Sequence, residues 1–286
     1  MVKLKISTET IGIIFAILAY LSFSLLDTIQ KTLIIYYSVF QLLFIKYCFT
    51  LCLSLIESRR KKNYKLYLTN NLKLQILRSL FSILESACFV LAFRYLSLAD
   101  AHSIGGLTPI IVVIFSSIFL REKITPKIWL AVIFGFIGVL IIMRPGLSIF
   151  DPNSLIPLSA ALFLGLYQVV TRKVSEYDQN ETSLFYTAIT GISIMGSLSF
   201  FYWIPINLSF IILFTGVGVF YSLGLYLQII ALSKARVSMV QPFHYTLIFW
   251  AIIFGFIFYK DIPDLFTIIG ATIIASSGIY IFKKSE

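Results

Sequence analysis

The chain has 286 residues, of which 59% are hydrophobic and 13% are charged, and 23 Lys and Arg outnumber 13 Asp and Glu. A soluble domain carries about twice this fraction of charged residues, so the composition excludes an ordinary soluble globular protein. The apolar segments are long and lack the alternation of β-barrel strands. We therefore predict an all-α integral membrane protein.

Ten apolar segments follow one another along the chain. Each is about 20 residues long, which is the length that an α-helix needs to cross a bilayer. They are Thr10–Ile29, Ser38–Ile56, Leu74–Leu91, Ala99–Leu120, Ile124–Met143, Asn153–Thr171, Thr182–Tyr202, Leu208–Leu232, Val237–Tyr259 and Pro263–Phe282. We predict ten transmembrane helices, which leave no length for a soluble domain.

The basic residues are distributed unevenly between the two sides of the predicted membrane. With a cytoplasmic N-terminus, seventeen Lys and Arg lie at inner ends and loops, and only four lie in outer loops. The positive-inside rule then places both termini in the cytoplasm. The net charge of +10 is explained by this topology and by contact with anionic lipids. Membrane lipids are thus expected partners, and nucleic acid is not.

The cysteines do not indicate a metal site. Cys48 and Cys52 are one helical turn apart and Cys88 is in the third segment, but no further ligand lies at a usual metal-binding spacing. We expect reduced, packed thiols, with no metal ion and no cofactor.

A short pattern occurs twice. Leu96-Ser97-Leu98-Ala99 returns as Leu232-Ser233-Lys234-Ala235, and a proline follows in the next segment each time. Division of the chain near Asp151 gives two halves, residues 1–150 and 151–286, with five segments each. Because five is odd, the second half enters the membrane from the opposite side, as in an inverted repeat. Such halves enclose a cavity near the midplane that opens to either side as they rock.

The same residues resemble the drug/metabolite transporter superfamily, EamA type. The resemblance covers nearly the whole chain and rests on the following residues: Leu96–Ala101, Pro109, Leu120–Thr125, Gly135–Val139, Ala231–Ala235, Gln241–Tyr245, Trp250-Ala251 and Pro263–Gly278. It implies ten helices in two five-helix repeats and a bacterial inner membrane. Asp261 departs from the Glu usual in the family, and Gly105-Gly106 replaces bulkier residues. Other residues resemble a subgroup that includes S-adenosylmethionine uptake carriers: Asp27, Lys31, Lys46, Phe243, Tyr245, Trp250 and Pro263-Asp264.

Ionisable side chains inside the membrane are costly and so are candidate functional residues. Glu85 is about 18 Å from the inner side and Lys46 about 12 Å from the outer side, so both lie at a similar depth. They are expected either to form a structural ion pair or to bind substrate. Arg78 is shallower, and we expect its side chain to extend towards lipid phosphates.

Four residues are candidate gating residues. Asp27 and Lys31 are spaced i, i+4 near the outer end of the first helix, where they form either a surface pair or an outer gate. Pro109 and Pro242 interrupt two predicted helices and leave carbonyl groups without donors. Such carbonyls are tolerated in a membrane only where they face protein or a wet cavity.

Polar and aromatic residues next to Pro242, and others within the sixth, eighth and ninth predicted helices, are candidate substrate-binding residues, with packing between helices as the alternative. They are Tyr167, Gln168, Gln228, Gln241, His244, Tyr245 and Trp250. Aromatic faces together with the carboxylate of Glu85 suit a cationic or zwitterionic substrate.

These features predict a secondary transporter that moves a small polar metabolite by alternating access. The sequence lacks the nucleophile motifs, metal-ligand spacings and phosphate-binding loop of common enzymes, and it lacks a channel filter motif. The alternatives are an exchanger of S-adenosylmethionine or an amino-acid-like metabolite and, in other classes, an intramembrane enzyme or a structural membrane protein. We expect a monomer or homodimer.

Overall fold

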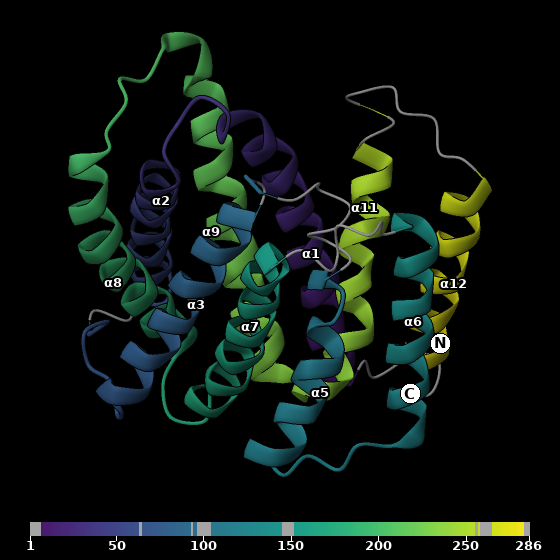
Figure 1. The fold of residues 1–286 in the computed structure, drawn as a ribbon. Helices are drawn as coiled ribbons and strands as arrows, with labels where there is room; N and C mark the ends of the chain where they lie inside the picture. The colour runs from purple at the N-terminus through teal and green to yellow at the C-terminus, as the bar shows by residue number, and fades with distance from the viewer. Residues whose placement is uncertain are drawn as a thin grey trace, which may run out of the picture.

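The computed structural model describes residues 7–62, 65–92, 94–95, 104–144, 152–254, 257 and 265–282. Helices account for nearly all of this part of the chain, and they run roughly side by side (Figure 1). The long helices are α1 (Thr8–Leu33), α2 (Val39–Arg60), α3 (Leu72–Ala92), α5 (Thr108–Phe119), α6 (Pro126–Met143), α7 (Leu155–Val174), α8 (Asn180–Phe201), α9 (Ile211–Lys234) and α12 (Leu265–Phe282). Short 3-10 turns, η2 (Pro152–Ser154) and η3 (Leu208–Phe210), precede α7 and α9, and the segment after α9 is divided into α10 (Val237–Val240), the 3-10 turn η4 (Gln241–Tyr245) and α11 (Thr246–Phe254).

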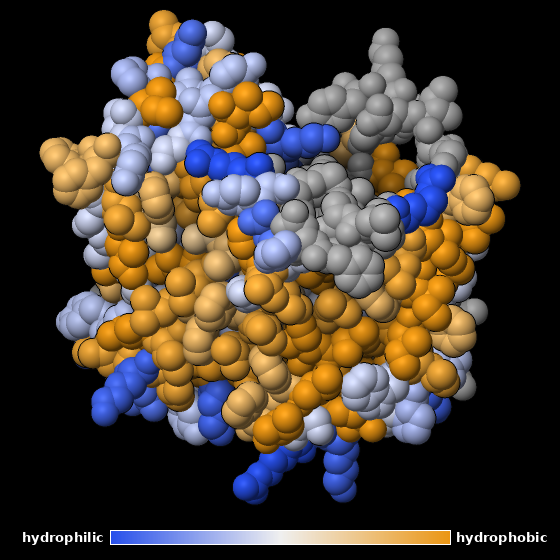
Figure 2. Space-filling view, in the orientation of Figure 1, coloured by the Kyte–Doolittle hydropathy of each residue, from blue (hydrophilic) through white to orange (hydrophobic). Residues whose placement is uncertain are grey.

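Seven helical stretches are long and apolar enough to cross a membrane, and three shorter apolar stretches accompany them in the described part of the chain. Each of the ten predicted segments overlaps one of these stretches. Figure 2 shows apolar side chains over the middle of one face, with hydrophilic side chains towards its lower and upper edges. The prediction of an all-α membrane protein is confirmed.

The two candidate gating prolines occupy different structural positions. Pro242 lies in η4, where α10 gives way to a 3-10 turn, so the predicted interruption is present. Pro109 instead lies in the first turn of α5, directly after a turn at residues 106–107 that separates α5 from the helical residues 104–105, so the predicted interruption is present here too. Proline suits this position because the first turn of a helix does not need its missing N–H. Residues 99–103 of that predicted segment lie outside the described residues.

The helix packing has a repeated pattern. The first five predicted segments correspond to α1, α2, α3, α5 and α6, and the second five to α7, α8, α9, α10–α11 and α12. Helix α1 packs on α9 and α11, while its counterpart α7 packs on α3 and α5. Helix α2 packs on its own counterpart α8, and α6 packs on its counterpart α12 (Figure 1). Exchange of the two halves therefore leaves this set of contacts unchanged.

Two glycines allow the close approach of α6 and α12. A Cβ atom on Gly138 would lie 2.9 Å from the carbonyl oxygen of Gly270, and one on Gly270 would lie 2.6 Å from that of Gly138. The backbones of the two helices touch at this point, as small residues permit in membrane proteins.

We expect Gly138→Leu to force α6 away from α12 and to lower the melting temperature of the purified protein. Overpacking of this kind costs about 1–3 kcal/mol. Ala275→Leu, on the exposed face of α12, is the matched control and should melt like the wild type. Thermal denaturation in detergent measures both, and equal melting temperatures would contradict the contact between the two glycines.

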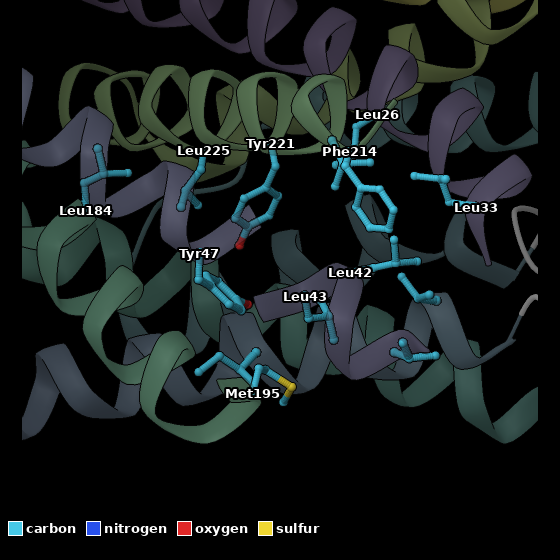
Figure 3. Close-up of a cluster of buried hydrophobic side chains, with 14 of the residues drawn as sticks. Leu26, Leu33, Leu42, Leu43, Tyr47, Leu184, Met195, Phe214, Tyr221 and Leu225 are labelled. Carbon is cyan, nitrogen blue, oxygen red and sulfur yellow. The ribbon is translucent and has the colours of Figure 1, made fainter. Parts of the chain in front are cut away.

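The largest apolar cluster joins α2 to α1, α8 and α9. Figure 3 shows Tyr47 of α2 and Tyr221 of α9 reaching towards each other across this cluster. Their ring centroids are 5.6 Å apart at an interplanar angle of 88°, an edge-to-face arrangement that aromatic pairs favour. This contact forms part of the wall next to the cavity described below.

Candidate functional site

A cavity of about 130 Å³ lies between helices of both halves. This volume is below the range of about 300–1,000 Å³ that is usual for sites of drug-sized ligands, so in this state the cavity suits a small ligand. Seven of the predicted site residues line it: Asp27, Lys46, Glu85, Tyr167, Gln228, His244 and Tyr245. The structure thus brings together residues that are separated by more than 200 positions in the chain.

Three charged residues reach the cavity from three successive helices. Asp27 lies on a face of α1 that also carries Tyr20 and Gln30, because spacings of seven and three residues repeat on one helical face. Lys46 comes from α2 and Glu85 from α3. The cavity wall therefore contains two carboxylates and one ammonium group.

The environments of Lys46 and Glu85 differ. Lys46 is only 2% exposed, and its Nζ lies 3.9 Å from the ring centroid of Tyr221 and 5.3 Å from that of Tyr47. Such contacts with aromatic faces stabilise a cation. The Glu85 carboxylate accepts a hydrogen bond of 3.0 Å from the hydroxyl of Ser86. Lys46 is not in any of the ion pairs found among the described residues, so it faces the cavity without contacting a carboxylate.

The candidate gating residues Asp27 and Lys31 also form no ion pair with each other. Asp27 lines the cavity, whereas Lys31 is exposed on the last turn of α1. Their spacing on the helix allows contact, but their side chains have different surroundings.

Tyr245 and His244 line the cavity from η4. The Tyr245 hydroxyl donates to the carbonyl oxygens of Gly106 and Val132, each at 3.2 Å, and so ties η4 to two neighbouring segments. The His244 ring packs edge-on against Tyr20, with centroids 5.0 Å apart. Both residues therefore shape the wall on the side of the second half.

Three predicted substrate-binding residues do not line the cavity. Gln168 of α7 and Gln241 of η4 are fully buried, and Gln241 Nε2 donates to Gln168 Oε1 at 2.7 Å and to Val237 O at 3.1 Å. This bond joins two helices of the second half, which is the packing alternative for these residues. Trp250 lies in α11 beside Phe249, with ring centroids 5.5 Å apart.

The expectation that Arg78 extends towards lipid phosphates is wrong. Its side chain is fully buried. The guanidinium donates to the carbonyl oxygen of Ser183, to Thr187 Oγ1 at 2.6 Å and to Gln75 Oε1 at 3.3 Å. The position of Arg78 near the start of α3 was evident from the sequence, but the polar groups that α8 supplies were not.

Arg78 belongs to a wider polar network that sequence reasoning missed, here called the closing network. Tyr226 donates to Glu57 at 2.9 Å, and Lys61 forms an ion pair with Glu181. Asp178 accepts hydrogen bonds of 2.9 Å from the Asn70 N–H and from Gln75 Nε2. These bonds connect α2 and α3 with α8 and α9. The only sequence signal was the position of the carboxylates at helix ends.

Asp178, in the loop between α7 and α8, provides a test of this network. Burial acts to raise its pKa, but hydrogen bonds from Asn70, Thr69 and Gln75 outweigh burial and hold the pKa below its usual value. A lowered pKa in the folded state contributes stability above the unfolded pKa of about 3.9, and this stability is lost as pH falls through the folded value.

We therefore expect Asp178→Asn to lower the melting temperature at neutral pH, and this deficit to shrink as pH falls below about 4. Glu176→Gln alters an exposed carboxylate two residues away and should have little effect. A deficit that stays constant with pH, measured by thermal denaturation, would refute the role of the ionised carboxylate.

Comparison with known proteins adds sequence and fold relationships to this geometry. A model of the EamA-like transporter family matches residues 10–144 and again residues 154–282. The chain is similar to an S-adenosylmethionine uptake transporter of Rickettsia bellii, with 25% identity over 98% of this chain and 96% of that protein. It is also similar to a riboflavin transporter of Vibrio cholerae, with 30% identity over 61% of this chain and 59% of that protein. A solved crystal structure covers 98% of both chains with a TM-score of 0.81 at 14% identity, which supports the fold alone.

Proposed function

The chain belongs to the EamA-like transporter family, and from this we propose that it is a secondary transporter of a small polar metabolite that works by alternating access. The cavity is the observation that carries the proposal. Charged side chains are costly at membrane depth, and here three of them are collected around one cavity between the two halves. Such a site is typical of a substrate pathway.

We propose that ten transmembrane helices form two inverted five-helix repeats, residues 1–150 and 151–286, with both termini in the cytoplasm of a bacterial inner membrane. The exchangeable helix contacts and the two family matches support this arrangement. The excess of basic residues at alternate ends of the helices supports the orientation. Rocking of one half against the other would then open the cavity to each side in turn.

The closing network supports a state in which the cavity is closed towards the cytoplasm. Glu57, Lys61 and Arg78 lie near the ends of α2 and α3 that the orientation places in the cytoplasm, and their bonds hold these ends against α8 and α9. The cavity residues Asp27, Gln30 and Phe89 lie nearer the opposite ends of their helices. We propose that the closing network seals the cytoplasmic side and that its bonds break when the transporter opens inward.

A more specific candidate is uptake or exchange of S-adenosylmethionine or an amino-acid-like metabolite. The relative from Rickettsia bellii, which matches almost the full chain, supports it. We propose a monomer or homodimer that has membrane lipids and a small-molecule substrate as its partners, with nucleic acid excluded.

Uptake of labelled metabolites by proteoliposomes tests the proposed function. We expect saturable uptake that is stimulated by unlabelled substrate on the opposite side of the membrane. Empty liposomes and heat-denatured protein are the controls. If none of a broad set of polar metabolites moves, or if flux is unsaturable and unaffected by substrate on the opposite side, secondary transport is contradicted.

A further inference from the structure

The charges around the cavity do not balance. Among the described lining residues, Asp27 and Glu85 are acidic and Lys46 is the one Lys or Arg, so the ionised set carries one excess negative charge. His244 and four tyrosines, at positions 20, 167, 221 and 245, are the other titratable side chains there. Arg78 lies close to Tyr167, but its guanidinium is hydrogen-bonded to α8.

The opposite charges are also held apart. Lys46 faces the ring of Tyr221, and no carboxylate lies within ion-pair distance of it among the described residues. Unpaired charges in a poorly solvated site are costly unless a partner compensates them. Asp27 and Glu85 interact with Lys46 electrostatically but make no ion pair with it, so each of the three groups can contact whatever enters the cavity.

Neutral polar groups of the wall are likewise left without partners. The Tyr20 hydroxyl and the Gln30 side-chain nitrogen are buried and make no hydrogen bond to protein, and both residues line the cavity from the face of α1 that carries Asp27. Buried polar groups are nearly always hydrogen-bonded in folded proteins, so unpartnered ones indicate a ligand or water.

We infer that the substrate is a metabolite of net charge +1 that has one carboxylate and two cationic groups. Its carboxylate contacts Lys46, and its two cations contact Asp27 and Glu85. The arrangement thus matches an α-amino acid whose side chain carries a second positive charge, such as an ammonium or sulfonium group. This inference rests on the proposed transport function and specifies its substrate class.

Two sets of three compounds test the charge requirement, because each set removes one charge at a time. L-lysine is compared with norleucine, which lacks the side-chain ammonium, and with cadaverine, which lacks the carboxylate. S-adenosylmethionine is compared with S-adenosylhomocysteine, which lacks the sulfonium charge, and with its decarboxylated form. In at least one set, we expect the fully charged member to stabilise the wild type against thermal denaturation at about ten-fold lower concentration than either analogue.

Variants assign each charge to its partner. Lys46→Met should reverse the preference for the carboxylate, so that the decarboxylated analogue stabilises at least as well as the parent compound. Lys46→Arg, which keeps the charge, and Lys31→Met, which alters an exposed lysine, should retain the wild-type order. Glu85→Gln or Asp27→Asn should remove most of the advantage that the second cationic group gives the parent compound.

The inference is overturned if the wild type does not distinguish the members of either set, or if Lys46→Met keeps the wild-type order. It is also overturned if proteoliposomes carry an uncharged solute, such as riboflavin, while no member of either set binds. That last result would leave the proposed transport function intact. Failure of every solute to move would instead contradict the transport function itself.

Discussion

Glu85→Gln is expected to reduce substrate uptake by about ten-fold or more at matched protein levels in the membrane. The carboxylate lines the cavity and accepts a hydrogen bond from a neighbouring serine on the same helix, so its charge is available to the substrate. Glutamine has nearly the same size but no charge. Loss of one charged contact in a buried site costs about 2–5 kcal/mol in other complexes, which accounts for the size of the effect.

Thermal denaturation separates this effect from misfolding. Since Gln removes a half-buried charge that forms no ion pair, Glu85→Gln should melt at or above the temperature of the wild type. Glu176→Gln changes an exposed carboxylate and should transport normally. Uptake by Glu85→Gln that equals the wild type would exclude Glu85 from the substrate pathway.

Arg78→Met, unlike Glu85→Gln, is expected to destabilise the folded protein strongly and to lower its melting temperature. It removes hydrogen bonds from a fully buried guanidinium to Ser183, Thr187 and Gln75 and leaves their polar atoms less satisfied. Hydrogen bonds to charged groups contribute about 1.5–3 kcal/mol each, so we expect the loss of these three bonds to cost about 4 kcal/mol or more.

The measurement is the melting temperature in detergent, with the exposed Arg59→Met as the control. A large fall for Arg78→Met alone supports its place in the closing network. A melting temperature like that of the wild type would mean that Arg78 is dispensable for packing, and Glu85 and Arg78 would then no longer differ in role.

The sequence predicted the helices well because the bilayer sets both their length and their apolar character. The sequence also singled out Asp27, Lys46 and Glu85 as candidate functional residues, because an ionisable side chain within a transmembrane segment is costly and is therefore rare without a function. The position of Pro109 was less predictable. A proline within an apolar run fits either a kinked helix or the first turn of a new one, and only tertiary structure decides between them.

Contacts between side chains of distant segments could not be predicted from the sequence. Gln168 and Gln241 are 73 residues apart, and each alone fits a substrate-binding role as well as a bond to the other. Arg78 likewise required knowledge of α8, whose Ser183 and Thr187 are more than 100 residues away. Helical periodicity gives the face on which a residue lies but not the helix that this face meets.

The central claim is that the cavity around Asp27, Lys46 and Glu85 is wet and opens to the two sides of the membrane in turn. The most direct measurement replaces Cys48, Cys52 and Cys88 by serine, introduces Ala161→Cys in the cavity wall, and labels right-side-out and inside-out vesicles with a membrane-impermeant maleimide. We expect labelling in both preparations, and we expect bound substrate to slow it. Absence of labelling from both sides, or labelling from one side alone whether or not substrate is present, would contradict it.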